Sequence, residues 1–89
     1  MFLDQILFLE ADGNYVKLGT DGKEYLLAST LSKLFDKIDF KDLVRTHRSY
    51  AVNIEKVDAF EGNKLYVGDK EIPIGRNHRD EVVKFFNFL

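Results

Sequence analysis

Two short clusters of basic and polar side chains contain the residues whose types and spacing could bind a negatively charged partner. The first cluster runs Arg45-Thr46-His47-Arg48-Ser49, and the second runs Gly75-Arg76-Asn77-His78-Arg79. An arginine side chain presents a planar fork of donors that suits a phosphate group or the O6 and N7 edge of guanine. Serine, threonine and neutral histidine can also hydrogen-bond to phosphate oxygens. Taken alone, each cluster is at least as compatible with an ordinary solvated loop or turn.

The chain around these clusters is predicted to be mostly β, with short antiparallel strands in small sheets, one short central helix and a short C-terminal helix. Turn signals recur between short runs of aliphatic and aromatic residues, which is typical of antiparallel hairpins. The turn signals are Asp12-Gly13-Asn14, Asp21-Gly22, Gly62-Asn63 and Gly68-Asp69. The runs predict one meander over residues 5–10, 15–20 and 24–29, and a second over 56–61, 64–67 and 70–74. Pro73 is expected at a sheet edge or a strand end, where no ladder donor is missed.

The two helices have different signals in the sequence. Leu31, Leu34, Phe35 and Ile38 fall at helical spacing on one apolar stripe, and Ser29 or Thr30 can cap the helix. A second helix is expected from about residue 80 to residue 89, with acidic residues in its first turn. Its Phe-rich end predicts either completion of a thin core or a partly exposed patch for a partner.

Length and composition set the scale of the molecule. The chain has 89 residues, which is enough for one domain over residues 1–89, and 45% of them are hydrophobic. The chain contains no cysteine, which excludes a disulfide framework and a thiolate metal site and suits a reducing cytosol. No apolar run approaches the ~20 residues that span a bilayer, and the first residues lack the features of a signal peptide. A cytoplasmic location without membrane attachment is expected.

The charge of the chain is uneven along the sequence. The formal net charge is −2, which argues mildly against nucleic-acid binding, because DNA-binding domains are usually basic. Residues 41–53 and residues 70–79 each carry +2, however, so the remaining residues carry −6. If folding brings the two basic stretches to one face, that face could attract phosphate groups.

Read in order along the chain, four segments resemble the LytTR family of DNA-binding domains. They are residues 6–16, residues 31–35, Arg45-Thr46-His47-Arg48-Ser49-Tyr50-Ala51-Val52-Asn53 and Ile72-Pro73-Ile74-Gly75-Arg76. The His-Arg-Ser-x-x-Val-Asn string is the most specific, and the Pro-Ile-Gly-Arg string follows it at the expected distance. The resemblance covers nearly the whole chain. It implies short antiparallel strands in more than one small sheet, with loops from one side entering successive major grooves of double-stranded DNA.

The resemblance also implies partners and site residues. Members typically follow a receiver domain in bacterial two-component response regulators, bind direct repeats as dimers and bend the DNA. Because a receiver domain would normally supply dimerisation, the isolated domain is expected to be monomeric or to bind weakly. The loop of residues 14–17, the His47-Arg48 cluster and Gly75-Arg76-Asn77 correspond to the DNA-contact regions. Arg48, Arg76 and Val16 are expected to touch bases. The candidates for contacts to the DNA backbone are Asn14, Lys17, Arg45, His47, Asn77 and Arg79.

Two positions depart from the family pattern, and other residues are expected to be structural. Val16 stands where many members have a polar residue, so only an apolar contact, for instance with a thymine methyl, is expected there. His78 stands where an aromatic residue such as tyrosine is common. Tyr15 and Tyr50 are expected to be buried or half-buried. Ser49 and Asn53 are expected to satisfy neighbouring backbone groups.

Two other classes of function compete with DNA binding. Ser49, His47 and either Asp42 or Asp58 could be written as a catalytic triad, but adjacency in sequence says nothing of geometry, and no catalytic motif accompanies them. No metal ligand spacing and no cofactor motif is present either. The remaining alternative is a protein-interaction or sensor module, supported by the acidic balance and the Phe-rich end. We therefore expect a DNA-binding domain that is not an enzyme and uses no cofactor or metal.

Overall fold

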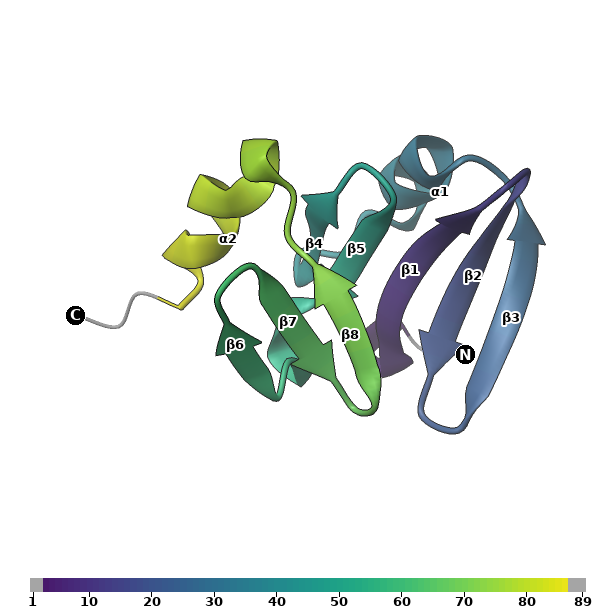
Figure 1. Ribbon diagram of the computed structural model, residues 1–89. Coiled ribbons are helices and arrows are strands. Elements are labelled where there is room, and N and C mark those ends of the chain that lie inside the picture. Colours follow the sequence, from purple (N-terminus) through teal and green to yellow (C-terminus); the bar gives the residue numbers. More distant parts are fainter. Residues whose placement is uncertain (1–2, 87–89) are drawn as a thin grey trace.

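The fold comprises eight strands and two helices within residues 3–86, the part of the chain that the computed structural model describes (Figure 1). The strands are β1 (Ile6–Asp12), β2 (Tyr15–Thr20), β3 (Lys23–Ala28), β4 (Leu43–His47), β5 (Tyr50–Asn53), β6 (Ala59–Glu61), β7 (Lys64–Val67) and β8 (Lys70–Pro73). The helices are α1 (Leu31–Ile38) and α2 (Arg79–Lys84), and single 3-10 turns occur at Leu3–Gln5, Ile54–Lys56 and Arg76–His78. The predicted mostly β class with a central and a C-terminal helix is confirmed.

The strands form two antiparallel sheets. The larger sheet has the order β3-β2-β1-β5-β4, and the smaller has the order β6-β7-β8. Both predicted meanders are present, and each of the four predicted turns has a glycine with positive φ. Pro73 is the last residue of edge strand β8, as expected. The sequence did not predict that the segment around the first basic cluster is a hairpin, β4–β5, whose second strand pairs with β1.

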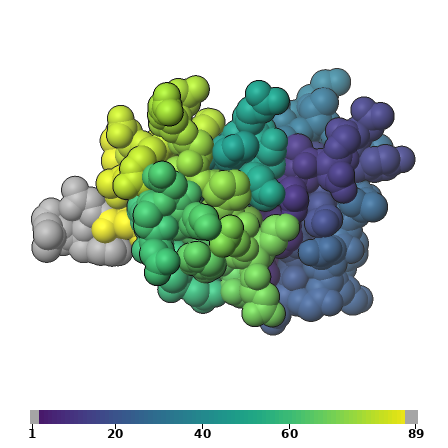
Figure 2. All heavy atoms as spheres, viewed as in Figure 1, coloured from purple at the N-terminus to yellow at the C-terminus, as the bar shows by residue number. Residues whose placement is uncertain are grey.

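The larger sheet has apolar side chains on both faces, so it separates two core clusters. On one face α1 covers a cluster formed by Ile6, Leu9, Val16, Leu18, Leu31, Leu43 and Ala51. On the other face the smaller sheet and α2 cover a cluster formed by Phe8, Val44, Val52, Leu65, Val67, Ile72, Ile74 and Val82. Each fully buried aliphatic side chain stabilises the fold by about 1.5–3 kcal/mol. Figure 2 shows the second meander and α2, in green and yellow, packed directly beside the first meander.

The helix caps agree in part with the sequence. Thr30, one of the two expected caps, accepts a hydrogen bond from the amide of Lys33 at 3.2 Å through its side chain, and Asp39 ends α1 in the left-handed conformation. Helix α2 is shorter than expected, because it ends at Lys84. Residues 87–89 of the expected helix lie outside the described part. Of the Phe-rich end, Phe86 packs edge-on against Phe60 at 4.9 Å between ring centroids, whereas Phe85 is exposed. No helix within residues 3–86 is long and apolar enough to cross a membrane.

Candidate nucleic-acid interface

Three connections lie together at one end of the larger sheet, on the upper side of the molecule in Figure 1. They are the β1–β2 turn with residues 13–14, the β4–β5 turn with residues 48–49, and the link after β8 with residues 75–78. We call these residues the loop end. The amide of Ala11 donates to the carbonyl of Ser49 at 2.8 Å, and the amide of Gly75 donates to the carbonyl of Thr46 at 2.6 Å. Two backbone hydrogen bonds therefore hold the three connections side by side.

The arginines of the chain are concentrated at this end. All four belong to the two basic clusters of the sequence. Arg48 in the β4–β5 turn and Arg76 in the link after β8 are exposed. Within residues 3–86 neither side chain takes part in an ion pair or donates a hydrogen bond to the protein. Their guanidinium donors are thus available to an anionic or base-edge partner.

Arg45 has a different environment from Arg48. Its Nε donates to the carbonyl of His47 at 3.2 Å, and its Nη2 donates to the carbonyl of Arg48 at 2.8 Å. Its Nη1 lies 3.4 Å from Ser32 Oγ on α1, and the guanidinium lies 5.8 Å from the centroid of the Phe35 ring. Most of the donors that could bind a phosphate group are therefore already used inside the protein.

His47 also has internal partners. Its Nδ1 accepts a hydrogen bond from the amide of Ser49 at 3.1 Å, and its ring lies edge-on to Tyr50 at 5.7 Å between centroids. Because Nδ1 is the acceptor, the neutral ring carries its proton on Nε2. Gly75 passes close to this ring: a Cβ added there would lie 3.4 Å from Cδ2 of His47. The φ of Gly75 is −72°, a backbone conformation that other residues also adopt.

The second basic cluster, like the first, contains both exposed side chains and a side chain that is held by partners inside the protein. Asn77 is exposed in the 3-10 turn, and neither that turn nor α2 has a side-chain cap. Arg79 is half-buried and donates to the carbonyl of Gly62 at 2.9 Å. Its guanidinium lies 5.8 Å from the centroid of the Phe60 ring. Arg79 thus attaches the start of α2 to the β6–β7 turn.

Beside the β1–β2 turn, the position of Val16 differs from the expectation that it touches a base. Its side chain is 0% exposed and belongs to the core beneath α1, so it has no surface with which to touch a base. Side chains alternate between the faces of a strand, so when Val16 points into the core its neighbours Tyr15 and Lys17 point away from it. Lys17 lies 4.0 Å from Glu24 on β3, beside the turn rather than in it. Asn14 is exposed in the turn, as expected.

Tyr15 is a candidate contact residue that sequence reasoning missed. It was expected to be buried or half-buried, but it is 50% exposed directly beside Asn14. The alternation of β2 contained the signal, because Val16 and Leu18 are apolar while Lys17 is charged. Tyr50, in contrast, is half-buried as expected. Asn53 is buried and structural as expected: its Nδ2 donates to the carbonyl of Ile6 at 2.8 Å, and its Oδ1 accepts from the amide of Glu55.

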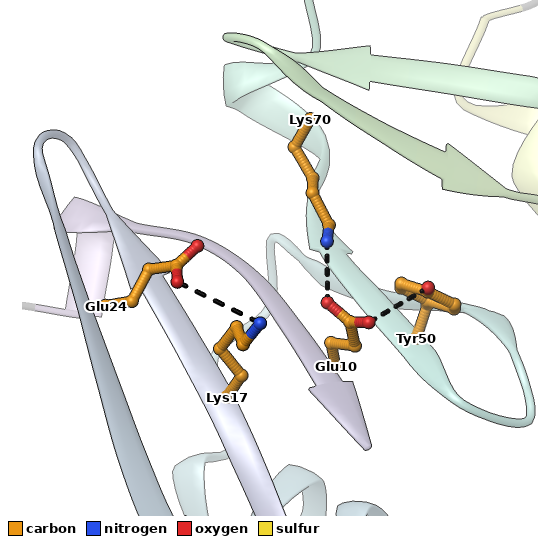
Figure 3. Close-up of polar contacts among 5 residues, drawn as sticks. All are labelled: Glu10, Lys17, Glu24, Tyr50 and Lys70. Atoms are coloured by element: carbon orange, nitrogen blue, oxygen red, sulfur yellow. Dashed lines mark hydrogen bonds and ion pairs between the residues drawn. The ribbon is translucent and has the colours of Figure 1, made fainter. Parts of the chain in front are cut away.

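A charged cluster behind the loop end joins the two sheets (Figure 3). Glu10 on β1 accepts from Nζ of Lys70 on β8 at 2.7 Å and from the hydroxyl of Tyr50 on β5 at 3.1 Å. Partial burial acts to raise the pKa of Glu10, but the hydrogen bonds and charge of Lys70, together with the Tyr50 hydroxyl, outweigh it and lower that pKa. The hydrogen bond to Glu10 raises the pKa of Lys70. Burial, followed by the Glu10 carboxylate, raises the pKa of Tyr50.

The groups exposed at the loop end are hydrogen-bond donors and acceptors. Within residues 3–86 no group of three histidine, cysteine or acidic side chains could hold a metal ion. The histidine and serine considered for a triad meet through the backbone amide of Ser49, not through its hydroxyl. This end of the sheet presents two guanidinium groups that have no ion-pair partner within residues 3–86, and an exposed amide at Asn77.

The comparison with known families is consistent with this arrangement. The family model of the LytTr DNA-binding domain matches residues 1–87. The chain belongs to this family. Among relatives of the LytTr domain, an uncharacterised response regulatory protein of Vibrio cholerae is 31% identical over 83 residues, which is 83% of this chain and 32% of that protein. The CO-responsive transcriptional regulator RcoM of Rhodospirillum rubrum is 35% identical over 78 residues, which is 80% of this chain and 33% of that protein.

A solved structure has the same fold as this LytTr domain. It is the LytTr DNA-binding domain of a protein described as a methyl-accepting/DNA response regulator from Bacillus cereus, with a TM-score of 0.78 and 17% sequence identity. The match covers 94% of this chain and 83% of that chain. The chain spans about a third of the length of the two curated relatives it matches.

Proposed function

We propose that the chain is the sequence-specific DNA-binding domain of a bacterial transcription regulator, and that its loop end enters the major groove of double-stranded DNA. The observation that carries this proposal is that Arg48 and Arg76 lie on neighbouring segments at the same end of the sheet. Both are exposed, neither is used in an ion pair within residues 3–86, and their loops are tied together by the Gly75–Thr46 hydrogen bond. Two guanidinium forks on neighbouring segments that are joined by a backbone hydrogen bond suit the reading of guanine edges.

The other candidates at the loop end have supporting roles in this proposal. Asn77 is exposed beside Arg76, where an amide can bind an adenine edge or a phosphate oxygen. Asn14 and Tyr15 lie in or beside the first turn, and Nε2 of His47 is a donor for a phosphate oxygen. Arg45, Arg79 and Lys17 are less suited to contact DNA, because each already has partners inside the protein. Val16 is removed from the proposal by its burial.

The wider setting follows from the family and its relatives. One relative is named a response regulatory protein and the other a CO-responsive transcriptional regulator, and each is about three times as long as the matched segment. We infer that this domain acts in the cytoplasm beside a second, signal-receiving domain, such as a receiver domain, and binds direct repeats of DNA as a dimer. The net charge of −2 makes non-specific affinity low, so base contacts contribute much of the binding.

The decisive experiment is a selection from a random duplex DNA library with three proteins. The wild type is compared with the Arg48→Ala/Arg76→Ala variant and with a Lys23→Ala/Lys56→Ala control. The control removes two charges as well, but from side chains near the β2–β3 turn at the opposite end of the sheet. We expect a recurring motif with the wild type and the control, ideally repeated at about one helical turn. The arginine variant is expected to lose it.

Each outcome of the selection leads to a different conclusion. Each single arginine variant is expected to lose roughly 5- to 150-fold in affinity for the selected site, the cost of one guanine contact. Enrichment that survives in the double arginine variant would keep DNA binding and overturn the site. No enrichment with any of the three proteins, even at low salt, would favour the protein-interaction alternative. Binding that does not weaken as salt rises would also contradict a phosphate-based interface.

A further inference from the structure

We propose that Arg45 is a positioning residue that fixes the β4–β5 turn so that Arg48 points at its target, and that it is not a phosphate contact. This inference rests on the proposed function, because the target of Arg48 is taken to be DNA. The evidence is the set of acceptors that Arg45 meets. Two of them are successive backbone carbonyls of the turn, those of His47 and of Arg48 itself.

The geometry explains why these two hydrogen bonds control the direction of Arg48. A carbonyl oxygen and the amide that follows it belong to one rigid peptide plane. Arg45 holds the planes on both sides of the Arg48 Cα, so the backbone torsions at Arg48 cannot change without breaking a hydrogen bond to Arg45. The strand register shifts between Arg45 and His47, which makes this a turn that ladder hydrogen bonds alone do not fix.

The other side of the Arg45 guanidinium is held by α1. Its Nη1 lies 3.4 Å from Ser32 Oγ, and the ring of Phe35 lies beneath it at 5.8 Å. A planar fork with five donors can reach three acceptors on two elements and stack on a ring at the same time, whereas the single ammonium group of lysine cannot. The residue type at position 45 is therefore set by geometry and not by charge alone.

The two basic clusters share this division of roles. In each, one arginine is anchored to backbone carbonyl oxygen and lies over a phenylalanine ring, and the arginine three positions away is free of such partners within residues 3–86. Arg45 is anchored and Arg48 free, while Arg79 is anchored and Arg76 free. Arg79, however, donates to Gly62 and not to the loop of its neighbour. It therefore serves as a matched control: an anchored, half-buried arginine whose hydrogen bond goes to the β6–β7 turn and not to the Arg48 turn.

The first arm of the test uses the free domain and no DNA. The amide of Ser49 donates to Nδ1 of His47, so its hydrogen exchange measured by NMR reports whether the turn is closed. We expect Arg45→Lys and Arg45→Gln to speed exchange at Ser49 by about threefold or more, because a hydrogen bond that holds the turn is lost. Exchange at the Leu9 amide in central strand β1 should follow global unfolding and serves as the stability reference. Arg79→Lys should leave Ser49 unchanged once global stability is taken into account.

The second arm is a double-mutant cycle on the selected DNA site. We expect Arg45→Lys to lower affinity about three- to tenfold when Arg48 is present and to have almost no effect in an Arg48→Ala background, because the two residues act as a unit. The dependence of affinity on salt should be the same in Arg45→Lys as in the wild type. Arg79→Lys should show no coupling to Arg48.

The outcomes separate this inference from the proposed function. Equal losses from Arg45→Lys in both backgrounds, full retention of affinity by Arg45→Lys, or unchanged exchange at Ser49 would each overturn the positioning role. Loss of affinity in Arg45→Gln but not in Arg45→Lys would instead make Arg45 a phosphate contact. If neither the wild type nor any variant binds DNA, the proposed function fails. The exchange measurement still decides whether Arg45 holds the turn.

Discussion

The amide of Gly75 donates to the carbonyl oxygen of Thr46 across 2.6 Å, and this hydrogen bond joins the loop that carries Arg76 to the strand that leads to Arg48. Two segments about thirty residues apart in the chain thereby share one surface. The placement of Arg76 relative to Arg48 depends in part on this link, since the segments that carry them belong to different sheets.

Gly75→Pro and Gly75→Ala test the link as a matched pair. The φ of Gly75 is −72°, which suits both substitutions, and a Cβ would meet His47 at ordinary contact distance. Proline removes the donor and leaves the carbonyl of buried Thr46 without this partner, so we expect it to lower the free energy of unfolding by about 1–3 kcal/mol. Alanine keeps the donor and should cost less than about 1 kcal/mol. Urea denaturation measures both, and equal losses would contradict the role of the hydrogen bond.

Gly19→Ala is expected to destabilise the domain strongly. A Cβ at Gly19 would overlap Cε2 of Phe8, a buried core residue, so the ring would have to move. We expect a loss of roughly 1–3 kcal/mol or more from overpacking, measured as a fall in the midpoint of thermal unfolding. The double variant with Phe8→Leu makes room for the methyl group. It should lose less than the two single losses added together, and strict additivity would argue against the clash.

The Glu10–Lys70 pair predicts how stability changes with pH at both ends of the scale. The pKa of Glu10 is lowered in the folded protein, so its contribution is present above its ordinary value near 4.5 and is lost as the pH falls through the lowered value. The pKa of Lys70 is raised, so its contribution is present below its ordinary value near 10.5 and is lost as the pH rises through the raised value.

Glu10→Gln is the variant that isolates this pair. It should lower the free energy of unfolding at pH 7 by about 1–2 kcal/mol, because a partly buried charged hydrogen bond is lost. It should also flatten the fall in stability below pH 4.5. Glu71→Gln is the control, since its ion pair with Lys64 is exposed and should contribute little. Denaturant unfolding over a range of pH tests both, and identical curves for Glu10→Gln and the wild type would contradict the assignment.

Thr46→Val is expected to leave stability unchanged or to increase it by about 1 kcal/mol. The side chain is 0% exposed, and its Oγ1 has no hydrogen-bond partner within residues 3–86. Valine has a similar shape and removes the unsatisfied hydroxyl, while the backbone carbonyl that accepts from Gly75 remains. DNA affinity should be unaltered. Calorimetric unfolding measures the change, and a clear loss of stability would mean that the hydroxyl has a partner after all.

Leu26→Lys is expected to reduce self-association without affecting the fold. Leu26 is 61% exposed on β3, an edge strand that also exposes Tyr25 and Leu27. A bare apolar edge strand is prone to pair with other chains, and a lysine there opposes such pairing. The midpoint of thermal unfolding should move by less than about 3 °C, equivalent to about 0.5 kcal/mol. Light scattering at increasing concentration measures association, and equal scattering by both proteins would contradict the prediction.

The sequence alone determined most of the local structure. Glycine and asparagine at the turns, period-two runs in the strands and the apolar stripe from Leu31 to Ile38 are local signals, and each depends on residues only a few positions apart. The family resemblance likewise uses strings of adjacent residues. These features placed both meanders, the capped helix, the strand-end position of Pro73 and the two basic clusters without knowledge of the tertiary structure.

Only the tertiary structure decided which side chains at the site are free. Arg45 and Arg48 have the same chemistry three residues apart, yet one is bound to carbonyls of its own turn and the other is exposed. Val16 was expected to touch DNA but is in the core, because pairing of β2 beneath α1 turned it inward. The exposure of a side chain depends on strand pairing and packing between segments distant in sequence, and a local pattern does not contain those contacts.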